Sequence, residues 1–394
     1  MLSENTAYDW SDPLLLDDQL NEEERLIQDS VRRFAQGRLA SVILEWSRHE
    51  EFDTEIMRDF GGMGLLGGTL EGYGCPGLSH VAYGVVGREL ERVDSAFRMA
   101  VGAHSGLAMG AIHAFGSEDQ KQRLLPAMAK GELLGCFGLT EPNHGSDPSG
   151  MEARARSVDS GYYLTGNKVW ITHAPIANIM VIWARDDSGD IGGFIAERGM
   201  NGLETPSIQG KFGARASPTG QIVMDGVFLP EENRLPGAQG LRAPLSCLTR
   251  ARFAIGWGVM GSAEFCWHTA RQYTLDRKQF GRPLAEMQLV QRKLADMQTE
   301  IALGLQAALR ISRLSDQGHA TPEMISLVKR NNVGKALNIA RTARDMLGGN
   351  GISDEFGIIR HIMNMEVVNT LEGTHDIHAL VLGRAQTGIS AFSD

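Results

Sequence analysis

Cysteines are few in this chain, and long uninterrupted apolar runs are missing. None of the four cysteines among its 394 residues forms a C-x-x-C pair; they are Cys75, Cys136, Cys247 and Cys266. A zinc ribbon or a redox-active dithiol is therefore not indicated, and reduced, mostly buried thiols are expected. The longest apolar stretch, around residues 254–267, is interrupted by glycines and by Glu264. It does not predict a membrane span.

Positive charge is also scarce. The 38 basic residues against 48 acidic ones give a net charge of −10. A protein that binds duplex nucleic acid must neutralise phosphates, so nucleic acid is not expected as a partner. The first residues, MLSENTAYDWSDP, lack the basic start and apolar block of a signal peptide. These features predict an intracellular protein, cytoplasmic or, in a eukaryote, located in the mitochondrial matrix after loss of a transit peptide.

Three regions differ in their hydrophobic periodicity. Apolar residues recur at helical spacing from residue 22 to about residue 129, where Pro126 requires a kink or a boundary. Between residues 133 and 229, five or six short strand-like runs indicate an antiparallel sheet, with a hairpin signal at Gly166-Asn167. Helical spacing then returns, and one helix is expected from Thr321-Pro322 to the glycines that begin at Gly348. The prediction is a mostly α, α+β chain with a helical domain (1–132), a β domain (133–240) and a helical bundle (241–394).

Two motifs in the β region could contact a flat heterocycle. LTEPNHGSD (139–147) offers Thr140, Ser146 and the amides of a glycine-containing turn, although these residues also suit an ordinary surface turn. KVWITHAP (168–175) places Trp170 beside Thr172, so that an indole face and a hydroxyl donor are adjacent. A strand with a core tryptophan would have the same pattern.

Motifs in the last third could bind phosphate or carry out acid–base chemistry. RKQFGRP (277–283) could bind a pyrophosphate or form a solvated turn, and LGGNG (347–351) could approach a phosphate or end a helix. In LEGTHDIH (371–378), Gly373 lets the chain turn sharply beside Glu372, and burial would make that carboxylate a base. The Glu-x-x-His spacing up to His375 lacks a second such motif, so no metal is expected.

Arg98 lies among apolar residues in VDSAFRMAV. Such an arginine either clamps an anion or forms a salt bridge at the surface of the core. The residues alone leave both readings open.

Taken together and in this order, LTEPNHGSD, KVWIT, DRKQFG, DMLGGNG and EGTHDIH resemble the acyl-CoA dehydrogenase family over essentially the whole chain. GELLGCFGLTEPNHGSDP, KRNNVGKALNIARTARDMLGGNGISDEFG and EGTHDIHAL are similar to its glutaryl-CoA branch. The resemblance implies an N-terminal helical domain, a central β domain, a C-terminal four-helix bundle and a homotetramer. It also implies that FAD is bound.

The resemblance further implies roles for individual residues. Residues on the flavin side would be Phe137, Leu139, Thr140, Ser146, Trp170 and Thr172, with Thr374 and Asp376 beside the cofactor. A neighbouring subunit would hold the adenosine and pyrophosphate with Arg277, Gln279, Phe280, Gln288, Gly348 and Gly349. The substrate would contact Arg98, Met99, Ser146, Arg252, Leu371 and Gly373.

The implied reaction is α,β-oxidation of a glutaryl-like acyl-CoA thioester, with or without loss of carbon dioxide. Glu372 would remove the α-proton while a β-hydride passes to the flavin, and Arg98 would pair with a distal carboxylate. The implied electron acceptor is an electron-transfer flavoprotein.

The sequence departs from the glutaryl branch at the expected acyl pocket. The branch has Tyr at the position of Leu371, a Ser/Val/Gln/Ser/Ser stretch where 102–106 reads GAHSG, and Asn-Ser at positions 173–174. His104 and His173 are expected at the pocket margin. An acyl group that differs from glutaryl is therefore predicted. Family resemblance is a better guide to the fold and the cofactor than to the substrate.

Two alternatives remain open. One is an oxygenase or oxidase of the same fold that reacts its flavin with molecular oxygen, on a CoA ester in specialised metabolism. The other is a scaffold that has lost catalysis, against which the presence of Glu372, Thr140, Thr172 and Arg277 argues.

Overall fold

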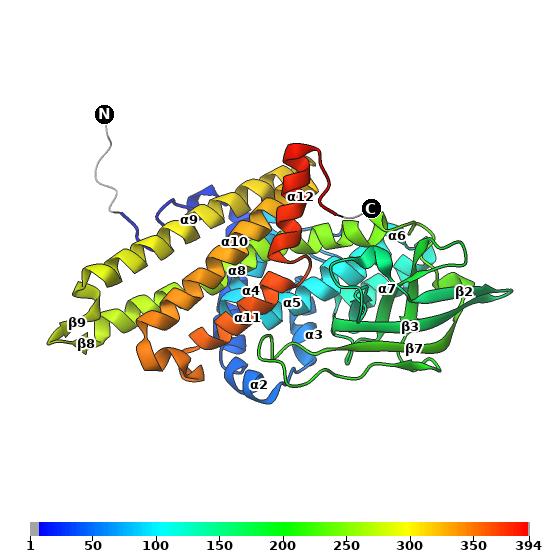
Figure 1. Cartoon of the computed structure of the whole chain (residues 1–394), viewed down its shortest axis with the longest axis horizontal. Helices are drawn as coiled ribbons and strands as arrows, with labels where there is room; N and C mark the ends of the chain where they lie inside the picture. Colours follow the sequence, from blue (N-terminus) through cyan, green and yellow to red (C-terminus); the bar gives the residue numbers. More distant parts are fainter. Residues whose placement is uncertain (1–7, 393–394) are drawn as a thin grey trace.

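The computed structural model describes residues 8–392 of the chain. The start of the segment analysed above for a signal peptide, residues 1–7, lies outside the described residues, as do residues 393–394. Figure 1 shows a twisted sheet at one end of an elongated molecule and long helices at the other, with shorter helices behind and between them. No helix in the described part of the chain is long and apolar enough to cross a bilayer.

The N-terminal part is helical, as predicted. Its first long helix starts with a capping box, in which the Asn21 side chain accepts the Glu24 amide and Glu24 accepts the amide of Asn21. Pro126 lies inside the last of these helices. The helices are α1 (Glu22–Phe34), α2 (Ile43–His49), α3 (Glu55–Gly62), α4 (His80–Val93), α5 (Ser95–Val101), α6 (Gly110–Phe115) and α7 (Glu118–Ala129), with π-helical segments at Ala35–Leu39 and Gly102–Met109.

The sheet has the order β1-β4-β2-β3-β7-β6, and β5 also pairs with β4. Its strands are β1 (Gly135–Gly138), β2 (Arg154–Val158), β3 (Gly161–Thr172), β4 (Ile179–Arg185), β5 (Ile191–Glu197), β6 (Leu203–Glu204) and β7 (Thr219–Pro230). The β2–β3, β3–β7, β4–β5 and β6–β7 pairs are antiparallel, as predicted. β1 differs because it runs parallel to β4, and β2 meets β4 in parallel at one residue pair.

The hairpin predicted at Gly166-Asn167 is wrong. β3 continues through both residues and pairs with β7 on either side of them. The register shifts between Leu164 and Gly166, and a side chain at Gly166 would lie 2.8 Å from Ala153. The glycine therefore marks a bulge where two backbones approach closely.

The C-terminal part consists of long antiparallel helices and two shorter ones. α10 begins as predicted, with the Thr321 hydroxyl accepting the Met324 amide and Pro322 in the first turn. A small hairpin, β8 (Lys278–Gln279) and β9 (Arg282–Pro283), joins the first two helices at the end of the molecule farthest from the sheet (Figure 1). The helices are α8 (Arg242–Asp276), α9 (Gln288–Asp316), α10 (Pro322–Met346), α11 (Ile358–Thr370) and α12 (His375–Thr387).

A buried ion cluster joins the N-terminal helices to this bundle. Glu264 of α8 accepts hydrogen bonds from Arg88 at 2.6 and 2.8 Å and from Arg92 at 2.6 Å. Burial alone would raise the pKa of Glu264, but the charges of Arg88 and Arg92 outweigh it and lower the pKa to about 2. Paired opposite charges therefore lie inside the contact between α4 and α8.

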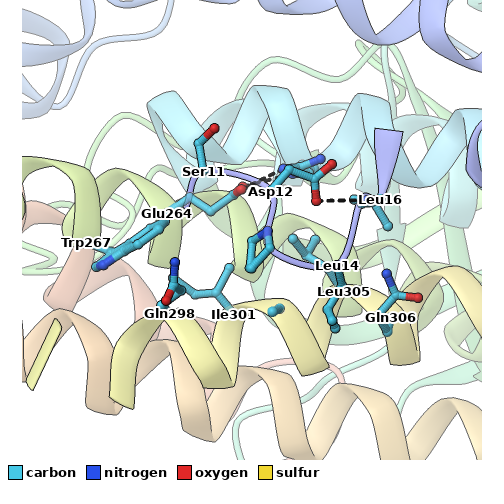
Figure 2. Close-up of a pocket in the computed structure, with 13 residues that line it drawn as sticks. Ser11, Asp12, Leu14, Leu16, Glu264, Trp267, Gln298, Ile301, Leu305 and Gln306 are labelled. Atoms are coloured by element: carbon cyan, nitrogen blue, oxygen red, sulfur yellow. Dashed lines mark hydrogen bonds and ion pairs between the residues drawn. The ribbon is translucent and has the colours of Figure 1, made fainter. Parts of the chain in front are cut away.

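The N-terminal segment covers this cluster. Figure 2 shows Ser11, Asp12 and Leu14 lying over Glu264 and the α8–α9 groove. The cavity left beneath the segment has a volume of about 10 Å³. It has room for about one water molecule and for no organic ligand.

Candidate active site

The link between α11 and α12, residues 371–374, has an unusual backbone. α11 ends where the Leu371 amide donates to the Val367 carbonyl, and α12 is capped by the Thr374 hydroxyl, which accepts the Ile377 amide. Glu372 between them has φ +54° and Gly373 has φ +96°. A left-handed conformation is rare for a residue with a side chain and concentrates at functional sites. The turn predicted at Glu372-Gly373 is thus present.

Two cations hold the carbonyl groups of this link. Arg252 of α8 donates from Nε to the Glu372 oxygen at 2.6 Å. Lys329 of α10 donates from Nζ to the oxygens of Leu371 at 2.7 Å and Gly373 at 2.6 Å. We call this pair, Arg252 and Lys329, the carbonyl clamp. It satisfies three consecutive carbonyl groups and stabilises the left-handed turn.

The Glu372 carboxylate lies buried at this turn. Its Oε2 atom is removed from water and has no hydrogen-bond partner among the described residues. Burial raises the pKa of Glu372, and the charges of Arg98, Lys329 and Arg252 oppose that rise only in part. A desolvated, unpaired carboxylate oxygen can accept a proton from a bound molecule.

Arg98 lies in the same charged cluster and is already paired. Its Nε atom donates to Glu91 Oε2 at 2.5 Å, and Glu91 also accepts the Ser95 hydroxyl at 2.9 Å. Arg98 as a whole is 3% exposed, and its Nη2 atom has no partner among the described residues. One donor of Arg98 is therefore free for a ligand. Tyr83 of α4 lies within the field of both Arg98 and Glu372, and burial raises its pKa to about 12.

The sheet presents an aromatic face with a hydroxyl residue nearby. Trp170 of β3 has φ +60° and is 60% exposed, and it lies in the stretch between Lys168 and Ile171 where the register with β7 shifts. Thr172 follows it and is partly buried. An exposed indole with a hydroxyl two residues away fits a flat ring system such as a flavin.

A buried ion pair supports the β1 end of this region. Lys168 Nζ donates to Glu141 at 2.8 Å and to the Leu139 carbonyl at 3.1 Å. Glu141 also accepts the amides of Glu152 and Ala153, which closes the loop after β1. Phe137 and Leu139 are buried, Thr140 is partly buried and Ser146 is exposed. The loop is thus held rigidly while its polar end faces outward.

The other predicted cofactor residues lie at the opposite end of the molecule. Arg277, Gln279, Phe280, Gln288, Gly348 and Gly349 are all exposed. They share one end of the bundle, because Asn350 beside the glycines donates to the Tyr273 hydroxyl near the end of α8 at 3.1 Å. α8 alone spans roughly 50 Å at 1.5 Å per residue, which separates this end from the sheet (Figure 1). Within one chain the two predicted sets of cofactor residues are not brought together.

The expectation that His104 and His173 line the pocket margin is wrong. The His104 ring accepts the Gly135 amide at 3.0 Å and contacts the Met128 carbonyl at 2.9 Å, and burial lowers its pKa to about 4. Burial likewise lowers the pKa of His173 to about 3. Both side chains are fully buried and lie beside Gly135 at the start of β1.

Sequence reasoning missed several charged groups of the site. Lys329, Glu91 and Tyr83 surround the predicted base or its arginine neighbour, and none was singled out. The available signal was helical spacing: Ile325, Lys329 and Asn332 share a face of α10 with apolar residues and are all buried. A lysine on a buried face needs a specific partner.

The chain matches three family models in sequence order. They are the acyl-CoA dehydrogenase N-terminal domain over residues 21–132, its middle domain over 136–227 and its C-terminal domain over 238–387. Isovaleryl-CoA dehydrogenase from Solanum tuberosum is 32% identical over 383 residues, which cover 95% of this chain and 92% of the relative.

Two solved structures are also similar. The crystal structure of glutaryl-CoA dehydrogenase from Mycobacterium smegmatis is 47% identical, with a TM-score of 0.95 over 97% of this chain and 99% of the other. A glutaryl-CoA dehydrogenase from the same organism, in complex with FADH2, is 42% identical, with a TM-score of 0.96 over 98% of this chain and all of the other.

Proposed function

The chain belongs to the acyl-CoA dehydrogenase family and is a flavin-dependent oxidoreductase, and we propose that it oxidises a glutaryl-like acyl-CoA thioester with FAD as cofactor. The observation that carries this proposal is the Glu372 carboxylate. Its Oε2 atom is desolvated and unpartnered among the described residues, yet three cations surround it. We also propose the domain division at residues 132 and 240.

The proton chemistry follows from this environment. A thioester acidifies the hydrogens on its α-carbon, and Glu372 takes one of them as a proton, so that the carboxylate becomes a neutral acid. Bound FAD supplies the acceptor for the hydride that leaves the β-carbon. The Glu372 amide, which has no acceptor among the described residues, is suited to bind the thioester oxygen as negative charge develops there. Leu371 and Met99 keep water from the reacting carbons.

The positions of the cofactor residues support a site shared between subunits. Trp170, Thr172 and Thr140 suit the flavin ring of one chain, whereas the exposed residues around Arg277 and Phe280 are too far away to hold the rest of the same molecule. Phe280 is 93% exposed, which is unusual for an aromatic side chain without a partner. A homotetramer in which this end of the bundle covers the cofactor of a neighbouring copy accounts for both facts.

We expect Arg277→Ala to reduce the amount of FAD that copurifies with the protein. An arginine bound to a phosphate is worth roughly 1.5–3 kcal/mol, so FAD affinity should fall by about ten- to a hundredfold. Flavin content per chain and molecular mass in solution are the measurements. The matched control is Arg282→Ala in the same exposed hairpin. Unchanged FAD affinity in Arg277→Ala would remove this residue from the cofactor site.

The acyl group is proposed to carry a polar or anionic end that reaches Arg98. The free nitrogen of Arg98 is buried, and a buried donor without a partner is costly unless a ligand satisfies it. Glu91 already balances part of the guanidinium charge, so an anionic end gains less there than it would beside an unpaired arginine. The side chains of Leu371 and Met99 offer no hydrogen-bond donor to a carboxylate of the acyl group. We therefore propose that the acyl group of the substrate differs in shape from plain glutarate.

We expect glutaryl-CoA to reduce the flavin about ten- to a hundredfold less efficiently than the preferred ester, because one missing donor to a buried carboxylate costs roughly 1–3 kcal/mol. The measurement compares anaerobic flavin reduction by glutaryl-CoA and by unsubstituted, branched and cyclic acyl-CoA esters. In Arg98→Met, the difference in flavin-reduction rate between esters with a polar end and the other esters should become smaller. Glutaryl-CoA as the best substrate, with crotonyl-CoA as product, would overturn the altered acyl preference. Oxygenated product in air without anaerobic reduction would favour the oxygenase.

A further inference from the structure

Lys329 is a buried lysine whose hydrogen bonds go to the backbone on both sides of Glu372. It is 2% exposed, and its Nζ atom lies 2.7 Å from the Leu371 oxygen and 2.6 Å from the Gly373 oxygen. Removing an ammonium group from water is expensive, and two carbonyl groups compensate less than a carboxylate would. Keeping a lysine here therefore calls for a role beyond packing.

Its two bonds fix the orientation of the peptide units around Glu372. A trans peptide is planar, so the carbonyl of Leu371 and the amide of Glu372 point in opposite directions. Holding the Leu371 oxygen towards α10 therefore turns the Glu372 amide away from α10. The bond to Gly373 fixes the other end of the turn, and Arg252 holds the carbonyl between them. Rotation of residue 372 would break bonds to both cations.

We propose that Lys329 is a positioning residue for Glu372: its Nζ atom, through the oxygens of Leu371 and Gly373, sets the direction in which the carboxylate and the amide of Glu372 face the substrate. The inference rests on the proposed function, because it takes Glu372 as the base. Lys329 itself touches no reacting atom in this scheme.

The charge of Lys329 has a second, measurable consequence. Charged or titratable groups face Glu372 from four helices, and they are Tyr83 of α4, Arg98 of α5, Arg252 of α8 and Lys329 of α10. His375 and His378 of α12 lie near Lys329, and burial lowers the pKa of both. Burial lowers the pKa of Lys329 to about 7, and its protonated form favours the ionised form of Glu372, so loss of that charge raises the pKa of the base.

Three substitutions in the FAD-loaded enzyme separate hydrogen bonding from charge. Lys329→Met removes both, Lys329→Gln keeps one amide donor without charge, and Lys329→Arg keeps donors and charge. The measurements are the pH dependence of anaerobic flavin reduction by the best acyl-CoA ester and a ¹³C NMR titration of Glu372. The Glu372 signal is identified by its loss in Glu372→Gln. Lys335→Met, which removes a half-exposed lysine of the same helix that pairs with Glu300 at 2.7 Å, is the control.

We expect Lys329→Met to slow flavin reduction about a hundredfold, which is the effect of a misplaced reacting group. The acidic limb of the pH profile, where the rate follows ionisation of Glu372, should move upward by about one pH unit. Lys329→Gln should show the same pH shift with a smaller loss of rate. In Lys329→Arg, the limb of the pH profile should lie where it does in wild type. Lys335→Met should match wild type in both rate and pH profile. If Lys329→Met fails to fold, Lys329→Gln still carries the test.

An unshifted pH limb and an unshifted Glu372 titration in Lys329→Gln would overturn the proposal and leave Lys329 a structural residue only. Failure of the proposed function looks different. In that case no acyl-CoA ester reduces the wild-type flavin. The NMR titration of Glu372 needs no substrate, so it still decides whether Lys329 acts on this carboxylate.

Discussion

Glu372→Gln is expected to abolish flavin reduction by acyl-CoA esters while FAD remains bound. The amide nearly matches the shape of the acid but cannot accept the α-proton, so the rate should fall on the order of 10³-fold. Because the Glu372 Oε2 atom has no hydrogen-bond partner among the described residues, the substitution breaks no bond to that atom in the resting protein. Anaerobic stopped-flow absorbance of the oxidised flavin measures the rate.

The matched control for this substitution is Glu366→Gln. Glu366 lies on α11 shortly before Glu372 and pairs with Arg341 at the surface. It should leave the reduction rate unchanged, and substrate binding should persist in both variants. Flavin reduction at the wild-type rate in Glu372→Gln would show that another group is the base.

Glu264→Gln is expected to destabilise the protein by about 3–5 kcal/mol. The substitution leaves the buried Arg88 without the carboxylate that it contacts and leaves Arg92 with Glu89 alone, and breaking a buried pair in this way costs that much. The change should appear as a lower urea midpoint at pH 7. Glu45→Gln, which removes an exposed partner of Arg48, is the control and should change stability by less than about 1 kcal/mol.

The effect of Glu264→Gln should depend on pH in a defined direction. The carboxylate has an ordinary pKa of 4.5 when unfolded and about 2 in the folded protein. Its contribution is therefore fully present above pH 4.5 and is lost as the pH falls from there towards 2. The stability difference between wild type and variant should shrink across that window. A difference that stays constant from pH 7 down to 2 would contradict the assignment of charge to Glu264.

Local signals in the sequence were sufficient for much of the fold. The helix start at Thr321 is as predicted, because an N-cap depends only on neighbours three residues away. The sharp turn at Glu372-Gly373 was predictable from the glycine that follows the acid. The assignment of the cofactor residues to two subunits came from family resemblance and stays a prediction.

Features that depend on distant contacts were not predictable in this way. Gly166 looked like a hairpin glycine, but its role is set by the approach of Ala153 from another strand. The parallel pairing of β1 with β4 depends on how the chain crosses between them. His104 and His173 were placed by their neighbours in sequence, whereas their surroundings come from Met128, Gly135 and Phe52. Lys329 gained its role only from a loop more than 40 residues later.

The most direct test of the central claim is anaerobic flavin reduction by an acyl-CoA ester deuterated at C2. If Glu372 removes an α-proton in the same step that delivers the β-hydride, wild-type protein should bleach its flavin without oxygen, and deuteration at C2 should slow that bleaching. The product should be the α,β-unsaturated ester. Reduction that is insensitive to C2 deuteration would contradict α-proton removal in that step. No bleaching by any acyl-CoA ester, together with oxygenated product in air, would contradict the dehydrogenase itself.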